Sequence, residues 1–124
     1  MNEELKTKKE NIIKQKSFQF ALEIIEVYKY LSNKKREYVL SKQLLRSGTS
    51  IGANVEEAIA GRSRKDFLYK MNIALKEARE TNYWLRLLKA SGYINGDNLI
   101  NQSIEIRKIL TSIVKTITIN YIDD

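Results

Sequence analysis

The sequence contains no proline, and this absence is the strongest constraint on its fold. Proline ends or kinks helices because it lacks a backbone N–H and clashes with the preceding turn. Only five glycines occur in 124 residues, while lysine, glutamate, leucine and isoleucine are abundant. These residue types are compatible with helices. We therefore expect helix over most of the chain.

Apolar residues recur at helical spacing in four segments joined by short polar connections. The segments cover about residues 10–31, 37–61, 64–90 and 98–119. Short connections place successive helices as antiparallel neighbours. The pattern predicts an all-α, up-down-up-down antiparallel four-helix bundle, with residues 1–124 forming a single domain. Residues 1–9 are polar, and we expect them to be frayed.

The first segment shows how the core-facing stripe is predicted. Its apolar residues recur in steps of three, four and five, and Ala21 and Ile24 widen the stripe. The stripe consists of Ile13, Phe18, Leu22, Ile25, Tyr28 and Leu31.

Helix ends carry local signals. Gly61 follows the last apolar residue of the second segment and is well placed as a C-cap. Ser63 and Asp66 have the spacing of a capping box that starts the third helix. Asp97 follows an Asn-Gly turn and can cap the fourth helix.

Several functions are excluded by what the sequence lacks. Without histidine or cysteine there is no His-dependent triad, no thiol nucleophile and no Cys/His zinc site. We expect no catalytic residues, no metal and no cofactor. No apolar run is long enough to span a membrane, and the N-terminus does not resemble a secretory signal. We therefore expect a cytoplasmic protein without a membrane partner.

The stretch Gln43–Gly61 combines two glycines with small polar residues inside a predicted helix. Gly48 and Gly52 suggest that another backbone packs closely there, either in a tight intramolecular crossing or in a subunit contact. Asn54, Ser47 and Ser50 indicate either a buried hydrogen-bond network, with Glu77 or Thr81 as partners, or a polar ligand pocket.

Carboxylates on the second and third segments allow two interpretations. Glu77 and Glu80 are three residues apart, and Glu56 and Glu57 are adjacent. Such carboxylates can bind a divalent metal, or they can form salt bridges. The candidate cations are Arg46, Lys76 and Arg79, and salt bridges are the favoured interpretation.

Basic residues cluster at two predicted turns, in a chain of net charge +7. The clusters are Lys34, Lys35 and Arg36 at the first turn, and Arg62, Arg64 and Lys65 at the second. Both can be solvated loops, or they can contact a nucleic-acid backbone. Alternate turns of a bundle fall at opposite ends. Tyr83, Trp84 and Arg86 could stack on bases, although packing or interface contact is favoured for Trp84.

The stretch QLLRSGTSIGANVEEA, followed by SRKDFLYKMNIALKEARETNYWLRLL, resembles the 23S rRNA intervening-sequence (S23) family. The resemblance covers nearly the whole chain and is most specific around Arg46–Asn54 and Glu77–Leu85. It implies a four-helix bundle that forms a homopentameric ring, with no defined activity. It also implies a relation to the basic accessory protein of diversity-generating retroelements, which works with a reverse transcriptase and nucleic acid.

These observations predict a non-enzymatic, basic homo-oligomer that associates with RNA or DNA as a scaffold. The alternative is a protein–protein assembly module that binds a protein partner and no nucleic acid. The residues assigned to helix packing or to the subunit interface are Arg46, Ser47, Gly48, Ser50, Gly52, Asn54 and Trp84.

Overall fold

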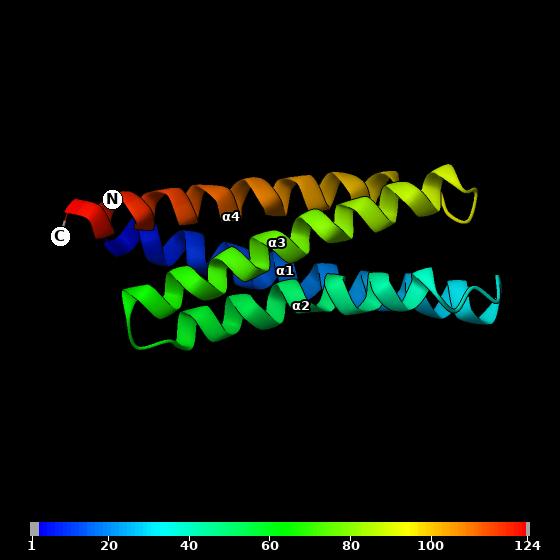
Figure 1. The fold of residues 1–124 in the computed structure, drawn as a ribbon, viewed down its shortest axis with the longest axis horizontal. Helices are drawn as coiled ribbons and strands as arrows, with labels where there is room; N and C mark the ends of the chain where they lie inside the picture. Colours follow the sequence, from blue (N-terminus) through cyan, green and yellow to red (C-terminus); the bar gives the residue numbers. More distant parts are fainter. Residues whose placement is uncertain (1–2, 124) are drawn as a thin grey trace.

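The computed structural model describes the backbone of residues 3–123 and the side-chain environments of residues 7–119. In this part of the chain the helices are α1 (Glu3–Asn33), α2 (Leu40–Ala60), α3 (Arg64–Ala90) and α4 (Asp97–Asp123). They run up and down in an antiparallel four-helix bundle, as the sequence predicts (Figure 1). The α2–α3 connection lies at the same end as the start of α1 and the end of α4. The other two connections lie at the opposite end.

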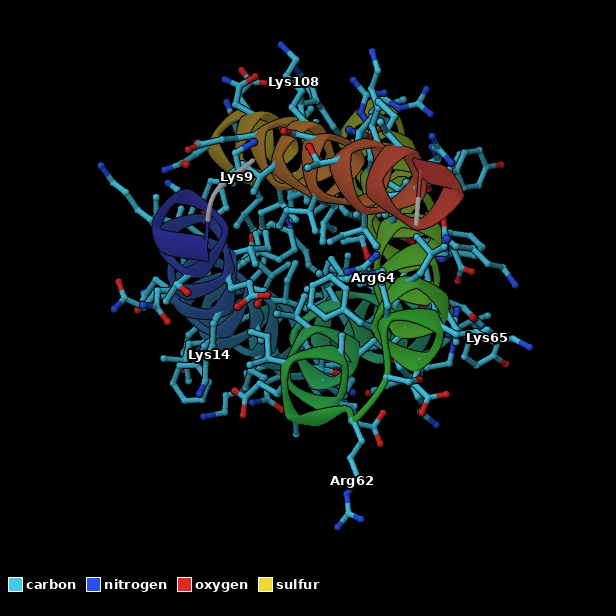
Figure 2. All side chains as sticks on the ribbon, turned by 90° about the vertical axis from the view of Figure 1, so that its left-hand side faces the viewer. Lys9, Lys14, Arg62, Arg64, Lys65 and Lys108 are labelled. Atoms are coloured by element: carbon cyan, nitrogen blue, oxygen red, sulfur yellow. The ribbon has the colours of Figure 1, made fainter. Side chains whose placement is uncertain are left out.

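Each helix packs against its two neighbours around the bundle. α1 contacts α2 and α4, and α3 contacts the same two helices. The end view in Figure 2 shows the four helices around a central core. Apolar side chains from every helix are fully buried there, which supplies the main stabilising term of the fold. The largest include Phe20, Ile24, Leu44, Ile51, Met71, Leu85 and Leu110.

Of the six residues in the predicted core stripe of α1, only Ile13 and Leu31 belong to the buried core, while Ile25 and Tyr28 are partly buried. Phe18 and Leu22 are 59% and 44% exposed, whereas Phe20 and Ile24 are fully buried. The reason is that a five-residue step from Ile13 to Phe18 departs from the helical period. The buried positions of α1 are spaced by four, three, four and seven residues, namely Ile13, Ser17, Phe20, Ile24 and Leu31.

α1 starts at Glu3, earlier than the predicted start near residue 10. Residues 1 and 2 lie outside the described residues. Lys9 Nζ donates to Ser112 Oγ at 2.8 Å, which ties this turn of α1 to α4. An amphipathic stripe does not predict such a contact, because it joins two polar residues across the bundle.

The start of α2 is capped by a buried carboxylate. Glu37, 8% exposed, accepts from the backbone N–H groups of Val39, Leu40 and Ser41. These groups would otherwise lack partners at a helix N-terminus, where the helix dipole also favours negative charge. The chain reaches this cap through Arg36, whose φ of 53° is left-handed. α2 therefore begins at Leu40, two or three residues later than predicted.

α3 starts with the predicted cap, because Ser63 Oγ accepts from Asp66 N at 3.0 Å. Gly61 ends α2 as its C-cap with φ −66° and ψ 155°, which is an extended and not a left-handed conformation. Asp97 is the first residue of α4, and its own N–H donates to Asn95 Oδ1 at 3.1 Å.

The glycines of α2 face α1. A Cβ at Gly48 would lie 2.8 Å from Ile24 Cγ2, and one at Gly52 would lie 3.3 Å from Ser17 Oγ. The Gly52 position is also 3.4 Å from the Ser17 carbonyl oxygen. The close approach suggested by the sequence is therefore an intramolecular crossing of α2 over α1.

Candidate nucleic-acid interface

The cations of the α1–α2 connection, Lys34, Lys35 and Arg36, are all exposed. Lys35 Nζ lies 5.9 Å from the centre of the Tyr30 ring, in cation–π range. Among the described residues, no carboxylate forms an ion pair with any of the three. This end of the bundle thus presents positive charge to solvent.

The cations of the α2–α3 connection point in three directions. Figure 2 shows Arg62 projecting away from the bundle, Lys65 projecting to the side, and Arg64 lying across the bundle end. Arg64 lines a cavity of about 340 Å³ with Glu10 and Ile117. The structure therefore does not gather Arg62, Arg64 and Lys65 into one patch. Their assignment to nucleic acid remains a prediction.

The two predicted basic clusters lie at opposite ends of the bundle, as the up-and-down topology requires (Figure 1). A short ligand therefore cannot contact both clusters of one subunit at the same time. Any surface that joins charge from both ends must run along the helices.

One row of exposed residues runs along α3 from Lys65, a member of the second cluster, although it includes none of Lys34, Lys35 and Arg36. Its residues are spaced alternately by four and three positions, so that they share one face of the helix. All of them are exposed, on the side of α3 opposite the core residues Met71 and Ala78. We call this face the α3 outer stripe, which consists of Lys65, Tyr69, Asn72, Lys76, Arg79, Tyr83 and Arg86.

The stripe carries two exposed aromatic rings between its cations. Tyr69 and Tyr83 are 64% and 48% exposed. The Arg86 guanidinium lies 5.8 Å from the Tyr83 ring centre, and Arg86 Nε donates to Asn82 Oδ1 at 2.8 Å. Sequence analysis singled out Tyr83 and Arg86 but missed the stripe. Its signal in the sequence is the recurrence of polar and tyrosine residues in alternating steps of four and three, whereas core prediction rests on apolar residues.

The acidic residues of α3 face α2 instead. Arg46 donates to Glu77 at 3.1 Å and to Glu80, so one guanidinium joins both carboxylates. Partial burial lowers the pKa of Arg46, but the negative charges of Glu77 and Glu80 outweigh it and leave the pKa raised. Trp84 Nε1 completes the cluster by donating to Glu80 at 3.0 Å. The predicted salt bridges therefore form, with Arg46 as the cation.

Lys76 and Arg79 do not take part in these salt bridges. In the described part of the chain neither forms an ion pair with a carboxylate. Glu57 pairs instead with Lys70 at 3.3 Å. Within residues 3–123 there is also no group of three or more acidic side chains placed to hold a metal ion.

The small polar residues of α2 divide between two roles. Thr81 Oγ1 donates to Ser47 Oγ at 2.9 Å, a buried bond between α2 and α3. Asn54 and Ser50 instead bond to backbone carbonyls of α2 itself. The network suggested by the sequence joins the helices through Ser47 alone.

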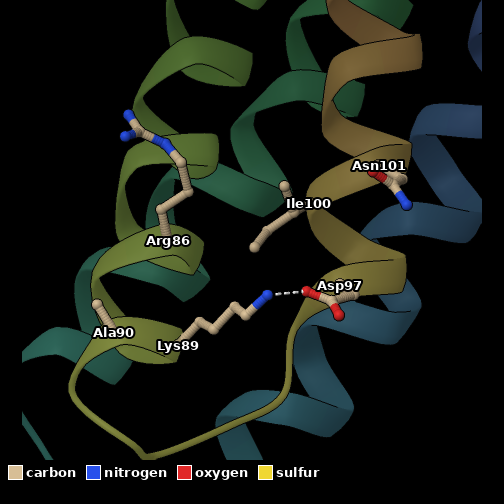
Figure 3. Close-up of a pocket in the computed structure, with 6 residues that line it drawn as sticks. All are labelled: Arg86, Lys89, Ala90, Asp97, Ile100 and Asn101. Carbon is tan, nitrogen blue, oxygen red and sulfur yellow. Dashed lines mark hydrogen bonds and ion pairs between the residues drawn. The ribbon is translucent and has the colours of Figure 1, made fainter.

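A shallow groove of about 520 Å³ lies where α3 meets the start of α4 (Figure 3). Arg86, Lys89 and Asn101 line it, and Ile100 forms part of its wall. Lys89 forms an ion pair with Asp97 across the groove. Lys89 is thus paired with a carboxylate, whereas Arg86, at the end of the α3 outer stripe, has no carboxylate partner among the described residues.

Comparison with known proteins identifies the fold and the family. A family model described as 23S rRNA-intervening sequence protein matches residues 9–112. The chain belongs to this family. A crystal structure of an S23 ribosomal protein family member of unknown function from Bacteroides thetaiotaomicron VPI-5482 is 54% identical, with a TM-score of 0.84. The match covers 86% of this chain and 98% of that one. No curated protein matches.

Membership of the 23S rRNA-intervening sequence protein family supports the predicted resemblance but assigns no activity, because the solved relative is described as having unknown function. Neither description indicates an enzyme. None of the helices within residues 3–123 is long and apolar enough to cross a membrane.

Proposed function

We propose that this protein is a non-enzymatic, self-associating basic bundle that binds nucleic acid, with RNA or an RNA–protein assembly as its partner. Exposed cations that have no carboxylate partner among the described residues carry this proposal. They include Lys34 and Lys35 at one end of the bundle, Arg62 at the other, and Lys76 and Arg79 along α3. With a net charge of +7, they favour a polyanionic partner. A cytoplasmic location is part of the same proposal.

Self-association is supported by the outer face of α1. Phe18 and Leu22 lie one turn apart on the side of α1 opposite its buried residues, and both are largely exposed. Neighbouring exposed apolar side chains are typical of protein interfaces. The pentamer implied by the family resemblance is one assembly that would cover this face, and each subunit of a ring would repeat the basic surface.

A mobility-shift measurement with RNA and DNA tests nucleic-acid binding. Contacts to phosphates release counterions, so we expect a shifted complex at about 50 mM salt that weakens steeply by about 200 mM. Equal binding at both salt concentrations, or none at about 50 mM, would contradict the proposal.

The second candidate function is a protein–protein assembly module without nucleic-acid binding. The exposed pair Phe18 and Leu22 favours it, since an apolar face fits another polypeptide better than a phosphate backbone. Absence of a nucleic-acid shift together with a stable oligomer would favour this candidate. The relation to the retroelement accessory protein remains a prediction.

A further inference from the structure

We propose that the α3 outer stripe is a binding surface for single-stranded nucleic acid, with its cations contacting phosphates and its tyrosines stacking on unpaired bases. The inference rests on the proposed function and specifies both the surface and the kind of strand. It also moves the main contact from the bundle ends to the side of one helix.

The length of the stripe suits an extended strand. Lys65 and Arg86 are 21 residues apart, which corresponds to about 32 Å along a helix that rises about 1.5 Å per residue. Lys76 and Arg79 lie near its centre, exposed and without a carboxylate partner among the described residues. A strand following α3 would therefore meet one cation at each end of the stripe and two near its centre.

The charges on either side of the α3 outer stripe also favour a polyanionic ligand. Glu77 and Glu80 lie on the α2 side of α3, where Arg46 pairs with both and offsets one of their two negative charges. On the other side, Ile100 of α4 shares the groove with Arg86. Arg107, seven residues after Ile100, lies on the same side of α4 and is exposed. The neighbouring helix thus adds positive charge beside the stripe.

The exposed tyrosines favour a single strand over a duplex as the ligand of the stripe. Bases in a duplex are stacked inside it, so an exposed ring can stack only on an unpaired base. Tyr69 and Tyr83 share the stripe with its cations, and Arg86 lies beside the Tyr83 ring. Stacking and phosphate contact are therefore available at adjacent points on one face. This combination is typical of sequence-tolerant single-strand binding.

The first test measures fluorescence anisotropy of the full-length protein with labelled oligouridine of about 16 nucleotides, the upper site size for a single-strand-binding module. We expect the Lys76→Gln/Arg79→Gln variant to bind more weakly than wild type. Its slope of log affinity against log salt should fall in magnitude by about 1.4, since each single-strand phosphate contact contributes about 0.7. The matched control, Lys34→Gln/Lys35→Gln, removes the same charge from the α1–α2 connection and should change affinity less.

The second test concerns stacking. We expect Tyr69→Leu and Tyr83→Leu each to weaken single-strand binding about tenfold, within the range for loss of one stacked base. Tyr38→Leu is the control, because Tyr38 is 53% exposed but lies outside the stripe. An RNA duplex of the same length should bind more weakly than the single strand and respond little to the tyrosine substitutions.

The outcomes separate this inference from the proposed function. If wild type binds nucleic acid but the Lys34→Gln/Lys35→Gln control loses at least as much affinity as the stripe variant, the stripe is wrong and the proposed function stands. If both tyrosine variants bind like wild type, or the duplex binds as tightly as the single strand, the single-strand assignment is wrong. If the wild-type protein binds neither the single strand nor the duplex, both the proposed function and the single-strand inference are wrong.

Discussion

Gly48 and Gly52 allow α2 to approach α1 more closely than any other residue type would. The two sites differ in what they face. A side chain at Gly48 would meet the buried, β-branched Ile24, while one at Gly52 would meet Ser17 at ordinary to slightly tight distances. The sequence predicts the close approach, because two glycines inside a helix require a packing reason. It does not predict the partner, since the register between two helices depends on the whole core.

The two glycines should therefore respond differently to alanine. We expect Gly48→Ala to destabilise the protein by about 1 kcal/mol or more, since the strain of overpacking exceeds the gain in helix propensity. Gly52→Ala should be close to neutral. Thermal melts of both variants measure this difference, and a higher melting temperature for Gly48→Ala than for wild type would disagree with the observed packing.

Arg46 joins α2 to α3 through two carboxylates, of which the Glu77 side chain is only 11% exposed. Replacing Arg46 with Gln leaves this carboxylate without its cation. We expect a loss of about 1.5–2 kcal/mol in unfolding free energy, at the lower end of the range for hydrogen bonds to charged groups. Lys70→Gln, which breaks the exposed pair with Glu57, is the control and should cost under about 0.5 kcal/mol. Equal losses in denaturant melts would show that Arg46 adds no more than an exposed ion pair.

At the scale of one element, α1 shows why the sequence predicts a helix but does not predict which side of it faces the core. Its inward side includes Ser17, a polar residue that interrupts the buried stripe where it meets Gly52. Its outward side carries Phe18 and Leu22, which look like core residues in the sequence. Both sides are apolar enough to match a helical period. Only packing against α2 and α4 decides which one is buried.

The outward side of α1 leads to a prediction about assembly. We expect Phe18→Glu/Leu22→Glu to reduce the oligomer mass measured by light scattering, because a charge in an apolar interface is costly to bury. Circular dichroism should show unchanged helix content, since neither residue belongs to the core. Val39→Glu, at a 73% exposed position in the α1–α2 connection, is the control. An unchanged mass for the double variant would exclude this face from the subunit interface.

The start of α2 also depends on one side chain that sequence analysis did not identify as a cap. Glu37 accepts from three backbone N–H groups. We expect Glu37→Ala to lower the unfolding free energy by about 1 kcal/mol, the usual cost of losing a cap. Glu56→Ala, at an exposed site within α2, should change it by less than about 0.5 kcal/mol. Chemical denaturation of both variants makes the comparison, and equal effects would argue against the cap.

At the scale of the whole molecule, helix packing determines which charged side chains form ion pairs and which stay exposed without one. Glu77 and Glu80 are held between α2 and α3 by Arg46, while Lys76 and Arg79 of the α3 outer stripe have no carboxylate partner among the described residues. The sequence predicts the bundle and its net charge, because both follow from pattern and composition. It does not predict which cations are paired, since Arg46 and Glu77 meet only after α2 and α3 have packed.

The most direct test of the central claim is the salt dependence of binding to single-stranded RNA by the wild-type protein. If Lys76, Arg79 and Arg86 each contact a phosphate, log affinity should fall against log salt with a slope of about −2 or steeper. No measurable binding at about 50 mM salt, or an affinity that does not change with salt, would contradict the claim that this basic bundle binds nucleic acid.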